Sequence, residues 1–369
     1  MSIQTFCLAL GLLGAVTVHA VGRPVVKADP LPQLHTQGNR ILDEQDRPVR
    51  LCGVNTACLE WSSDGEGHIL DTVKVAIHDW KANIVRVPLC QDRWFGQTHK
   101  IDFYGQTIPG QADDGAGYRA LVRQVVDYCA SNRCYVLLDL HWNDAGMWGE
   151  NIGQHVMPDM NSLTFWHSCA REYRNNPAVL FDLYNEPHNT TWDIWLNGGE
   201  ISETRGDGAR QGQFVPVKYQ TPGMQKMLDA VRNQGARNVV VCGGLDWAYD
   251  LSGFLKGYAL KDTIGDGVVY ACHAYNNKGE TIDKWLSHLD AALPHIPVIM
   301  SEFGGQNSGA TVNQPNAWVD RVIKEMDKRH CNYAAWDMHP AAGPTLISDW
   351  KYTPTPSFGV LVKASLARR

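Results

Sequence analysis

The sequence predicts an α/β fold, a single-domain (β/α)8 TIM barrel, from three features of its hydrophobic pattern. Eight apolar runs recur along the 369 residues. Most are continuously hydrophobic rather than alternating, which is typical of parallel strands covered on both faces. Segments with helical periodicity separate the runs, and strands that alternate with helices favour a parallel barrel. The runs comprise residues 49–55, 83–89, 134–141, 179–186, 238–244, 268–275, 297–304 and 331–338.

The segments between these runs have the spacing of amphipathic helices. Ile69, Val73 and Ile77, for example, share one face after the first run. Thr221 followed by Pro222 is typical of a helix start. A helical segment therefore follows each run, near residues 64–80, 118–125, 163–173, 222–235, 250–256, 281–289, 318–326 and 358–366.

Three connecting segments stand out from this alternation. Residues 34–43 precede the barrel and predict a hairpin that caps the barrel floor. The longest connections follow the third and fourth runs, over residues 142–161 and 187–220. Loops of that length often carry function.

The first twenty residues resemble a secretory signal. Residues 6–18 are apolar or small, and Val18-His19-Ala20 is similar to a cleavage site, although residues 1–5 carry no Lys or Arg. The run is too short to span a bilayer. We therefore expect a signal peptide at residues 1–20, secretion to the extracellular space or periplasm, and no membrane association after cleavage. An ordinary apolar strand or an anchor is the alternative.

Length and charge bound the class of protein. At ~150 residues per domain the chain could hold two domains, but α/β barrels exceed that size as one domain. No Ser/Thr/Pro-rich linker divides the sequence, so we expect one domain over residues 21–369. The net charge of −6 and pI of 6.1 argue against nucleic acid, whose phosphates require a basic surface. A neutral polymer or small molecule fits better, and a monomer is expected.

The sequence implies no metal and no cofactor. It contains no C-x-x-C, H-E-x-x-H, G-x-S-x-G or G-x-x-x-x-G-K pattern. Nine of the ten cysteines lie outside the expected signal. Cys129 could bridge to Cys134, and Cys58 to Cys90, and the pairing stays open.

Two glutamates end apolar, strand-like runs. Glu186 follows Asn185 at the end of the fourth run, and Glu302 closes the apolar part of the seventh. A carboxylate at the end of a buried strand is costly unless it has partners or a task. In a (β/α)8 barrel the C-terminal strand ends meet at one face, where chemistry collects. Two carboxylates that face each other there are the groups that cleave a glycosidic bond.

Other polar and aromatic residues mark the same strand ends, and together they carry a family resemblance. The eight positions are Arg86, His141, Asn185, Glu186, His273, Tyr275, Glu302 and Trp336. With these residues in this order on these strands, the chain resembles glycoside hydrolase family five, the cellulase family, over about residues 34–363. Asn-Glu-Pro alone would be a weak motif. The long loop after the fourth run, with its Trp192-x-x-Trp195 motif, departs from the family pattern.

The resemblance implies that Glu186 is the acid/base and Glu302 the nucleophile. Arg86 beside Glu302 would keep that carboxylate ionised, and Glu186 needs a raised pKa to protonate the leaving oxygen. The two carboxylates should then lie ~5–5.5 Å apart, and the reaction should retain configuration. The other six positions are implied to bind substrate: Arg86, His141, Asn185, His273, Tyr275 and Trp336. Asn185 would bind the sugar 2-hydroxyl, and Trp336 would lie under the sugar at the cleavage point.

Each assignment has a structural alternative. Arg86 could simply bridge strands, the histidines could be satisfied core residues, and Trp336 could pack the barrel. Loop tryptophans could stack on sugar rings or merely cover loops. We expect four of them to bind substrate, namely Trp142, Trp148, Trp192 and Trp247.

The sequence thus predicts a secreted retaining endo-β-1,4-glucanase that hydrolyses a β-linked polysaccharide or oligosaccharide by double displacement. A β-mannanase or an exo-acting β-glycosidase of the same family is the first alternative, since loops set the glycan and the mode of attack. A carbohydrate-binding protein without turnover is the second, because a fold alone never establishes catalysis.

Overall fold

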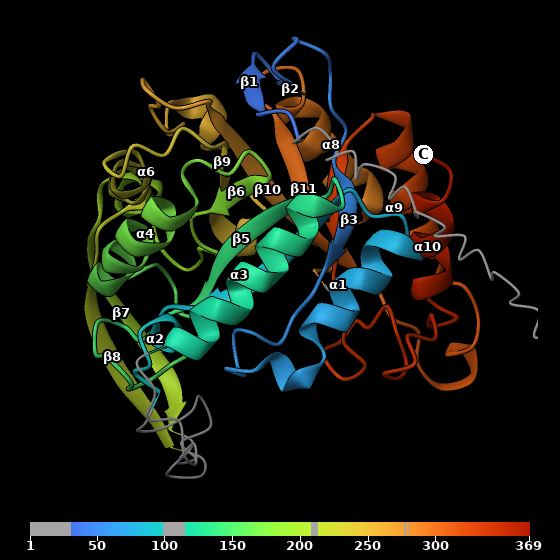
Figure 1. Cartoon of the computed structure of the whole chain (residues 1–369), viewed down its shortest axis with the longest axis horizontal. Coiled ribbons are helices and arrows are strands. Elements are labelled where there is room, and N and C mark those ends of the chain that lie inside the picture. The colour runs from blue at the N-terminus through green and yellow to red at the C-terminus, as the bar shows by residue number, and fades with distance from the viewer. Residues whose placement is uncertain (1–30, 99–114, 208–212, 277, 280) are drawn as a thin grey trace, which may run out of the picture.

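Eight parallel strands close into a barrel in the computed structural model, which describes residues 31–98, 115–207, 213–276, 278–279 and 281–369 (Figure 1). Neighbouring strands follow one another in chain order, and the last strand pairs with the first. The strands are β3 (Cys52–Asn55), β4 (Ile84–Cys90), β5 (Tyr135–Trp142), β6 (Val179–Asp182), β9 (Val240–Gly243), β10 (Val268–Tyr275), β11 (Val298–Gly304) and β12 (Asn332–Ala335). Each lies within or beside a predicted run, which confirms the (β/α)8 barrel.

Helices surround the barrel and supply the crossovers between its strands. The longer ones are α1 (Ile69–His78), α3 (Ala116–Ser131), α4 (Met160–Tyr173), α6 (Met224–Arg232), α8 (Ile282–Ala292), α9 (Ala317–Lys328) and α10 (Gly359–Leu366). Only α7 (Leu245–Ala248) and the 3-10 turn η2 (Phe254–Lys256) stand between β9 and β10, so the fifth predicted helix is a short one. The other short elements are η1 (Gly65–Gly67), α2 (Gln91–Trp94), α5 (Trp192–Asn197) and η3 (Gly309–Thr311).

Helix starts follow the local capping chemistry. Asp159 caps α4, where its carboxylate accepts from the backbone N–H of Ser162 and the Ser162 side chain bonds back to Asp159. Thr281 caps α8 by accepting from the backbone N–H of Lys284. Both caps satisfy N–H groups that have no partner within the helix.

The barrel strands are buried on both faces, which explains their continuous hydrophobic runs. Along β5, Val136 and Leu138 face the helices, whereas Tyr135 and Leu137 belong to a separate core inside the barrel. Because successive side chains alternate, the next inward position on this strand is Asp139. The interior is therefore apolar near the N-terminal ends of the strands and polar near their C-terminal ends.

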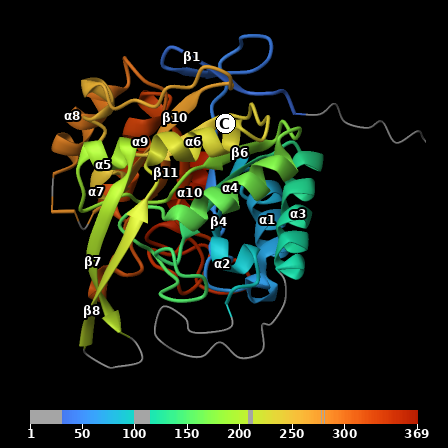
Figure 2. The ribbon, with the colours of Figure 1, turned by 90° about the vertical axis from the view of Figure 1, so that its left-hand side faces the viewer.

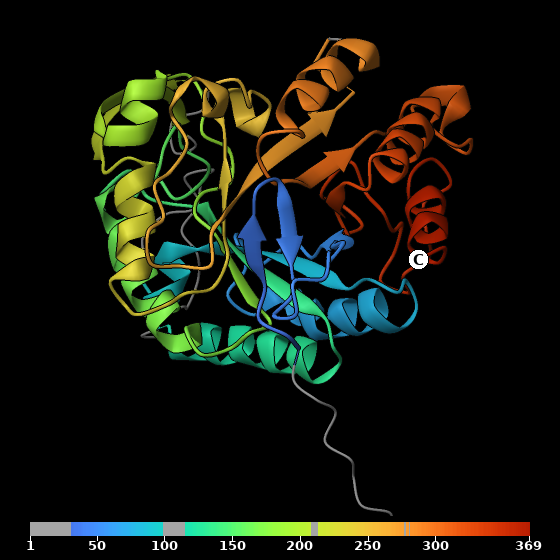
Figure 3. The ribbon, with the colours of Figure 1, turned by 90° about the horizontal axis from the view of Figure 1, so that it is seen from above.

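The predicted hairpin covers the apolar end of the barrel. It consists of β1 (His35–Gln37) and β2 (Arg40–Leu42), whose strands pair in antiparallel fashion. Ile41 joins the core inside the barrel, and the backbone N–H of Thr36 donates to the carbonyl oxygen of Asp266 at 2.8 Å. Figure 3 shows this blue hairpin lying across the barrel end.

A second hairpin, which the hydrophobic pattern had presented as loop, occupies part of residues 187–220. Strands β7 (Gly199–Asp207) and β8 (Gln213–Thr221) pair along their whole length. Figures 1 and 2 show them reaching away from the barrel on the side of α5 and α4. We call this element the rim hairpin.

The remaining sequence predictions concern membrane spans, the signal peptide and the disulfides, and they are compared with the described part of the chain. No helix within it is both long and apolar enough to cross a bilayer. The expected signal peptide, residues 1–20, lies outside it. Its nine cysteines are all buried and free, so neither suggested disulfide is formed.

Candidate active site

An open pocket of about 540 Å³ lies at the polar end of the barrel. Both predicted catalytic glutamates line it, together with side chains from three barrel strands, β5, β10 and β11, and from the segments that follow the barrel strands. The lining residues are His141, Trp142, Gln154, Asn185, Glu186, Trp247, His273, Tyr275, Lys278, Glu302, Trp336, Gly343 and Pro344. The pocket therefore gathers segments from His141 to Pro344 that are far apart in the sequence.

The two glutamates reach this pocket in different ways. Glu302 lies within β11, whereas Glu186 follows the end of β6 by four residues. His273 lies between them, and its Nδ1 is 2.8 Å from Glu186 Oε1 and 3.6 Å from Glu302 Oε2. One ligand atom from each of these three residues lies within 4.8 Å of the other two. The carboxylates are thus close neighbours across the pocket.

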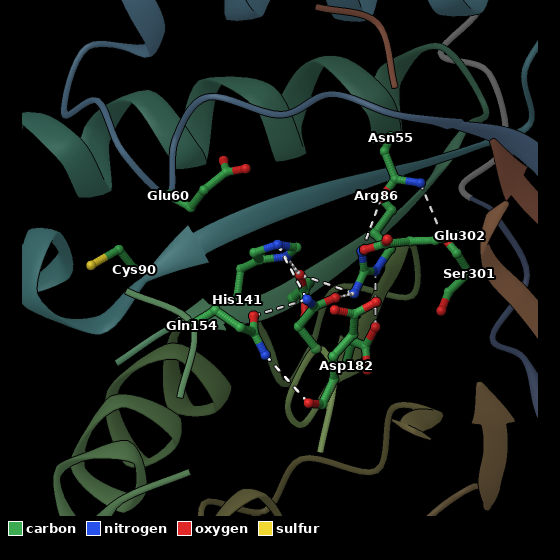
Figure 4. A network of polar contacts seen from close by, with 12 residues as sticks. Asn55, Glu60, Arg86, Cys90, His141, Gln154, Asp182, Ser301 and Glu302 are labelled. Carbon is green, nitrogen blue, oxygen red and sulfur yellow. Dashed lines mark hydrogen bonds and ion pairs between the residues drawn. The ribbon is translucent and has the colours of Figure 1, made fainter. Parts of the chain in front are cut away.

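Arg86 organises the charges beneath the pocket (Figure 4). Its guanidinium is completely buried on β4 and donates hydrogen bonds to four oxygen acceptors. These are Glu302 Oε1 at 2.7 Å, Asn185 Oδ1 at 2.8 Å, Asp182 Oδ2 at 2.9 Å and Asn55 Oδ1 at 3.0 Å, and Asp139 Oδ2 adds an ion pair at 3.0 Å. Burial alone would lower the pKa of Arg86, but the three surrounding carboxylates outweigh it and raise that pKa. The guanidinium is accordingly a permanent cation under Glu302.

Glu302 accepts two strong hydrogen bonds. Arg86 donates to Oε1, and the Tyr275 hydroxyl donates to Oε2 at 2.5 Å. Burial, followed by the charges of Glu302 and Glu186, raises the pKa of Tyr275 well above its usual value. Tyr275 therefore keeps its proton and remains a donor. Both oxygens of the Glu302 carboxyl group are therefore held by hydrogen-bond donors, one of them a cation.

Glu186 has a different electrostatic setting. Burial of the Glu186 carboxyl group raises its pKa to about 7, although the charges of His141, Arg86 and Lys278 lower it. The side chain is 19% exposed, so a substrate oxygen can still reach it. A carboxyl group with this pKa holds a proton below neutral pH and can release it within the physiological range. The two carboxylates are thus electrostatically unlike.

The two histidines of the pocket are neutral and have defined tautomers. Burial lowers the pKa of His141 to about 4 and that of His273 to about 3. His141 donates from Nδ1 to Asp139 at 2.6 Å, and its Nε2 faces the Asn185 amide nitrogen at 3.2 Å. His273 donates from Nδ1 to Glu186, while its Nε2 accepts from the Ser301 hydroxyl at 2.9 Å. Each ring is held by one donor contact and one acceptor contact.

Some of the predicted aromatic residues reach the pocket and others do not. Trp336 lies on its wall and stacks on His141, with 5.3 Å between ring centroids and 17° between planes. Trp142 and Trp247 also line it. Trp148 instead packs edge-on against Phe95. Trp192 lies in an aromatic cluster with Trp195, Phe254 and Tyr258, so we leave Trp148 and Trp192 out of the proposed substrate-binding set.

Several residues of the site had been given no role from the sequence. Asp139 and Asp182 pair in register on neighbouring strands and both contact Arg86. Burial raises the pKa of each to about 7, against the lowering effect of Arg86. Alternation could have found Asp139, which lies two residues before His141 on the same face of β5. Gln154 and Lys278 come from irregular segments, where no periodic signal exists.

Three neighbouring side chains of the pocket also have the chemistry to hold a cation. Glu186, His273 and Glu302 form the one group of potential metal ligands found in the described residues. Their ligand atoms are already engaged with each other, with Arg86 and with Tyr275. Because these atoms already have protein partners, we assign no metal to this group.

Comparison with known families settles the classification. The Cellulase (glycosyl hydrolase family 5) model matches residues 42–342 of the chain. The chain belongs to glycosyl hydrolase family 5. This family 5 protein carries Glu186 and Glu302 within the matched region, and the resemblance inferred from the strand-end residues is confirmed.

Curated relatives and solved structures agree with this family. An endoglucanase of Paenibacillus polymyxa is 24% identical over 385 residues, covering 94% of this chain and 91% of its own. The endoglucanase MaCel5A of Microbulbifer sp. is 26% identical over 83% of this chain, which spans only 51% of that protein's length. The β-glucanase SdGluc5_26A of Saccharophagus degradans, solved with cellotetraose, aligns over 92% of this chain and 94% of its own at 19% identity with a TM-score of 0.69. The catalytic domain of Thermobifida fusca endoglucanase Cel5A covers 91% of this chain and 97% of its own at 17% identity and a TM-score of 0.64.

Proposed function

We propose that this family 5 protein is a secreted, retaining endo-β-1,4-glucanase that cleaves β-linked glucan by double displacement. The observation that carries the proposal is the pairing of two close but electrostatically unlike carboxylates, Glu186 and Glu302. One carboxylate oxygen of Glu186 lies within 4.8 Å of a carboxylate oxygen of Glu302. Retaining enzymes place their carboxyl groups ~5–5.5 Å apart, whereas inverting enzymes need ~6.5–9.5 Å to admit a water molecule. The short separation therefore favours retention.

In the first step Glu302 attacks the anomeric carbon and Glu186 protonates the departing glycosidic oxygen. The bond from the anomeric carbon to that oxygen breaks, and an ester bond from the carbon to Glu302 forms. Arg86 and Tyr275 hold the Glu302 carboxylate in position for this attack. The raised pKa of Glu186 means that it still carries the proton it must donate.

In the second step the ionised Glu186 takes a proton from water, which attacks the same carbon and releases Glu302. The sugar leaves with its original configuration after two inversions. Asn185 lies beside Glu186 and can bind the 2-hydroxyl of the reacting sugar, a contact that strengthens in the transition state. Trp336 provides an indole face on the pocket wall for the sugar ring.

Endo action on β-1,4-glucan is supported by the open pocket and by the relatives. Trp247 is 37% exposed at the pocket edge, as a platform for a further sugar would be. The Paenibacillus and Microbulbifer relatives are named endoglucanases. Secretion is supported by the composition of residues 1–20.

The test combines product analysis with a matched pair of variants. Proton NMR of cellotetraose hydrolysis should show the β-anomer first, and the viscosity of carboxymethylcellulose should fall faster than reducing ends appear. Glu302→Gln should abolish turnover while cellotetraose still binds by calorimetry. Glu172→Gln, which alters an outer ion pair with Arg123, is the control and should keep full activity. The α-anomer as first product, or full turnover by Glu302→Gln, would refute the mechanism.

The same assays separate the alternatives. Faster release from mannan than from glucan would replace glucanase by mannanase. Reducing ends that appear without a fall in viscosity would indicate exo action. Binding without any product from any β-glycan would indicate a carbohydrate-binding protein.

A further inference from the structure

Gln154 is a pocket residue that comes from the connection between β5 and α4. It lines the pocket with Asn185 and Glu186. Its Oε1 accepts from Asn185 Nδ2 at 3.0 Å, and its Nε2 donates to the backbone carbonyl of Glu186 at 3.4 Å. Figure 4 shows Gln154 directed toward the polar cluster around His141 and Arg86. Gln154 therefore touches the residue that is proposed to bind the sugar 2-hydroxyl.

The Asn185 amide has one orientation and no spare N–H in this state. Its oxygen accepts from Arg86 at 2.8 Å, so its nitrogen must point the other way. The two N–H groups of that nitrogen face His141 Nε2 at 3.2 Å and Gln154 Oε1 at 3.0 Å. A neutral His141 accepts at Nε2 because its Nδ1 carries the proton. A sugar hydroxyl that takes an N–H from Asn185 must therefore displace or share the contact with His141 or the contact with Gln154, and in the second case the accepting Oε1 is left beside that hydroxyl.

The rim hairpin clamps the segment that carries Gln154. The His155 ring contacts the Glu203 carboxylate through Nδ1 and the backbone carbonyl of Asn151 through Nε2. The same carboxylate accepts from the backbone N–H of Val156 at 3.1 Å. These contacts join β7 to the residues that directly follow Gln154.

The second strand of the hairpin adds a further clamp. The Tyr219 hydroxyl on β8 donates to the backbone carbonyl of Met157 and accepts from its backbone N–H, each at 2.9 Å. Tyr219 and Met157 are both buried. One phenol thus satisfies both backbone groups of a residue three positions from Gln154, which limits how far this segment can move.

We propose that Gln154 hydrogen-bonds the C2 hydroxyl of the sugar held by Asn185, and that Glu203 and Tyr219 of the rim hairpin position it there. The proposal rests on the function proposed above and adds a specificity-determining residue to it. Glucose and mannose differ in configuration at C2. An oxygen acceptor fixed beside Asn185 is placed to distinguish the equatorial hydroxyl of glucose from the axial one of mannose. Gln154 is then part of the selection for glucan.

The test for Gln154 removes one partner of the hydrogen bond at a time. kcat/KM is measured for the wild type and Gln154→Ala on an aryl β-cellobioside and on its analogue that lacks the 2-hydroxyl next to the scissile bond. We expect Gln154→Ala to lose about tenfold on the full substrate, the cost of one neutral hydrogen bond, and little on the 2-deoxy analogue. An equal loss on both substrates would overturn the proposal. The proposed function fails separately, by absence of wild-type turnover or of retention.

The positioning role is tested by substitutions remote from the sugar. Tyr219→Phe removes the hydroxyl that binds Met157, and Glu203→Gln weakens the contact with His155. Both should reduce kcat/KM on the full substrate more than on the 2-deoxy analogue, and adding Gln154→Ala to either should cost little more. Lys218→Gln, which changes an exposed pair with Glu200 on the same hairpin, should leave both values unchanged. Losses that are equal on both substrates, or fully additive with Gln154→Ala, would show that the hairpin only supports the fold.

Discussion

Replacing Arg86 by methionine should destabilise the protein strongly and in a pH-dependent way. Arg86 is fully buried and contacts the carboxylates of Glu302, Asp182 and Asp139 at 2.7, 2.9 and 3.0 Å. Removing one partner of a buried ion pair costs about 3–5 kcal/mol, because the other charge stays buried without compensation. Three such pairs do not sum, since the remaining carboxylates can take up protons. We therefore expect a loss of about 3–5 kcal/mol in unfolding free energy near pH 7.5.

The sign of the pH dependence follows from the same carboxylates. In the wild type the pKa of Asp139 and of Asp182 is raised to about 7 in the folded state, above the unfolded value of 3.8. Groups with a raised folded pKa bind more protons when folded, so their favourable contribution is full below about pH 4 and is lost as pH rises through 7. Without the guanidinium these pKa values rise further. The cost of Arg86→Met should therefore be clearly smaller at pH 5 than at pH 7.5.

Urea unfolding followed by tryptophan fluorescence at both pH values measures this difference. Arg232→Met is the matched control, because Arg232 is also buried but pairs with the single carboxylate of Asp262, at 2.7 Å. Arg232 lowers the pKa of Asp262 against the effect of burial, so that pair is ionised at both pH values and its loss should depend less on pH. An Arg86→Met protein as stable as the wild type at pH 7.5, or one with the same penalty at pH 5, would contradict the reasoning.

Three further outcomes follow from the site. The pKa of about 7 for Glu186 predicts that kcat/KM falls about tenfold per pH unit above 7, because the acid must be protonated; a rate that is flat to pH 9 would argue against that role. Lys278→Met should move this alkaline limb to higher pH, since Lys278 lowers the pKa of Glu186; a shift to lower pH in the same rate profile would contradict it. Tyr275→Phe removes the 2.5 Å hydrogen bond to Glu302 and should lower kcat about 10–100-fold with little change in melting temperature, whereas Tyr258→Phe at the surface should be neutral.

Much of the fold could be predicted because barrel strands leave a recognisable pattern in the local sequence. Strands buried on both faces give unbroken apolar runs, and each of the eight runs overlaps a barrel strand. The rim hairpin was missed because the sequence of β7 is rich in polar residues and glycine, and because Pro216 interrupts the short alternation of Val215, Val217 and Tyr219 in β8. Such a ribbon is stabilised by pairing between its strands and by contacts with a distant loop, and neither leaves a strong local pattern.

The residues of the site likewise divide into those that the sequence could place and those that it could not. Arg86, His141, Tyr275 and Glu302 lie on strands whose direction and alternation place them at one barrel mouth, so their convergence could be expected. The tryptophans of the loops could not be placed, since the direction of a loop side chain depends on packing rather than on a period. Trp247 faces the pocket, whereas Trp148 and Trp192 pack against other aromatic residues.

By itself the sequence determined the barrel, the order of its strands and the polar residues at their ends, because periodicity and strand direction are local properties of a chain. Only the tertiary structure decided which neighbours make Glu186 and Glu302 unlike. Their difference arises from what surrounds each of them, since Arg86 and Tyr275 come to Glu302 from other strands while burial acts on Glu186. The same holds for Gln154, which a hairpin about 50 residues further along the chain holds beside Asn185. The electrostatic surroundings of a side chain depend on its neighbours in space, and the fold determines which residues those are.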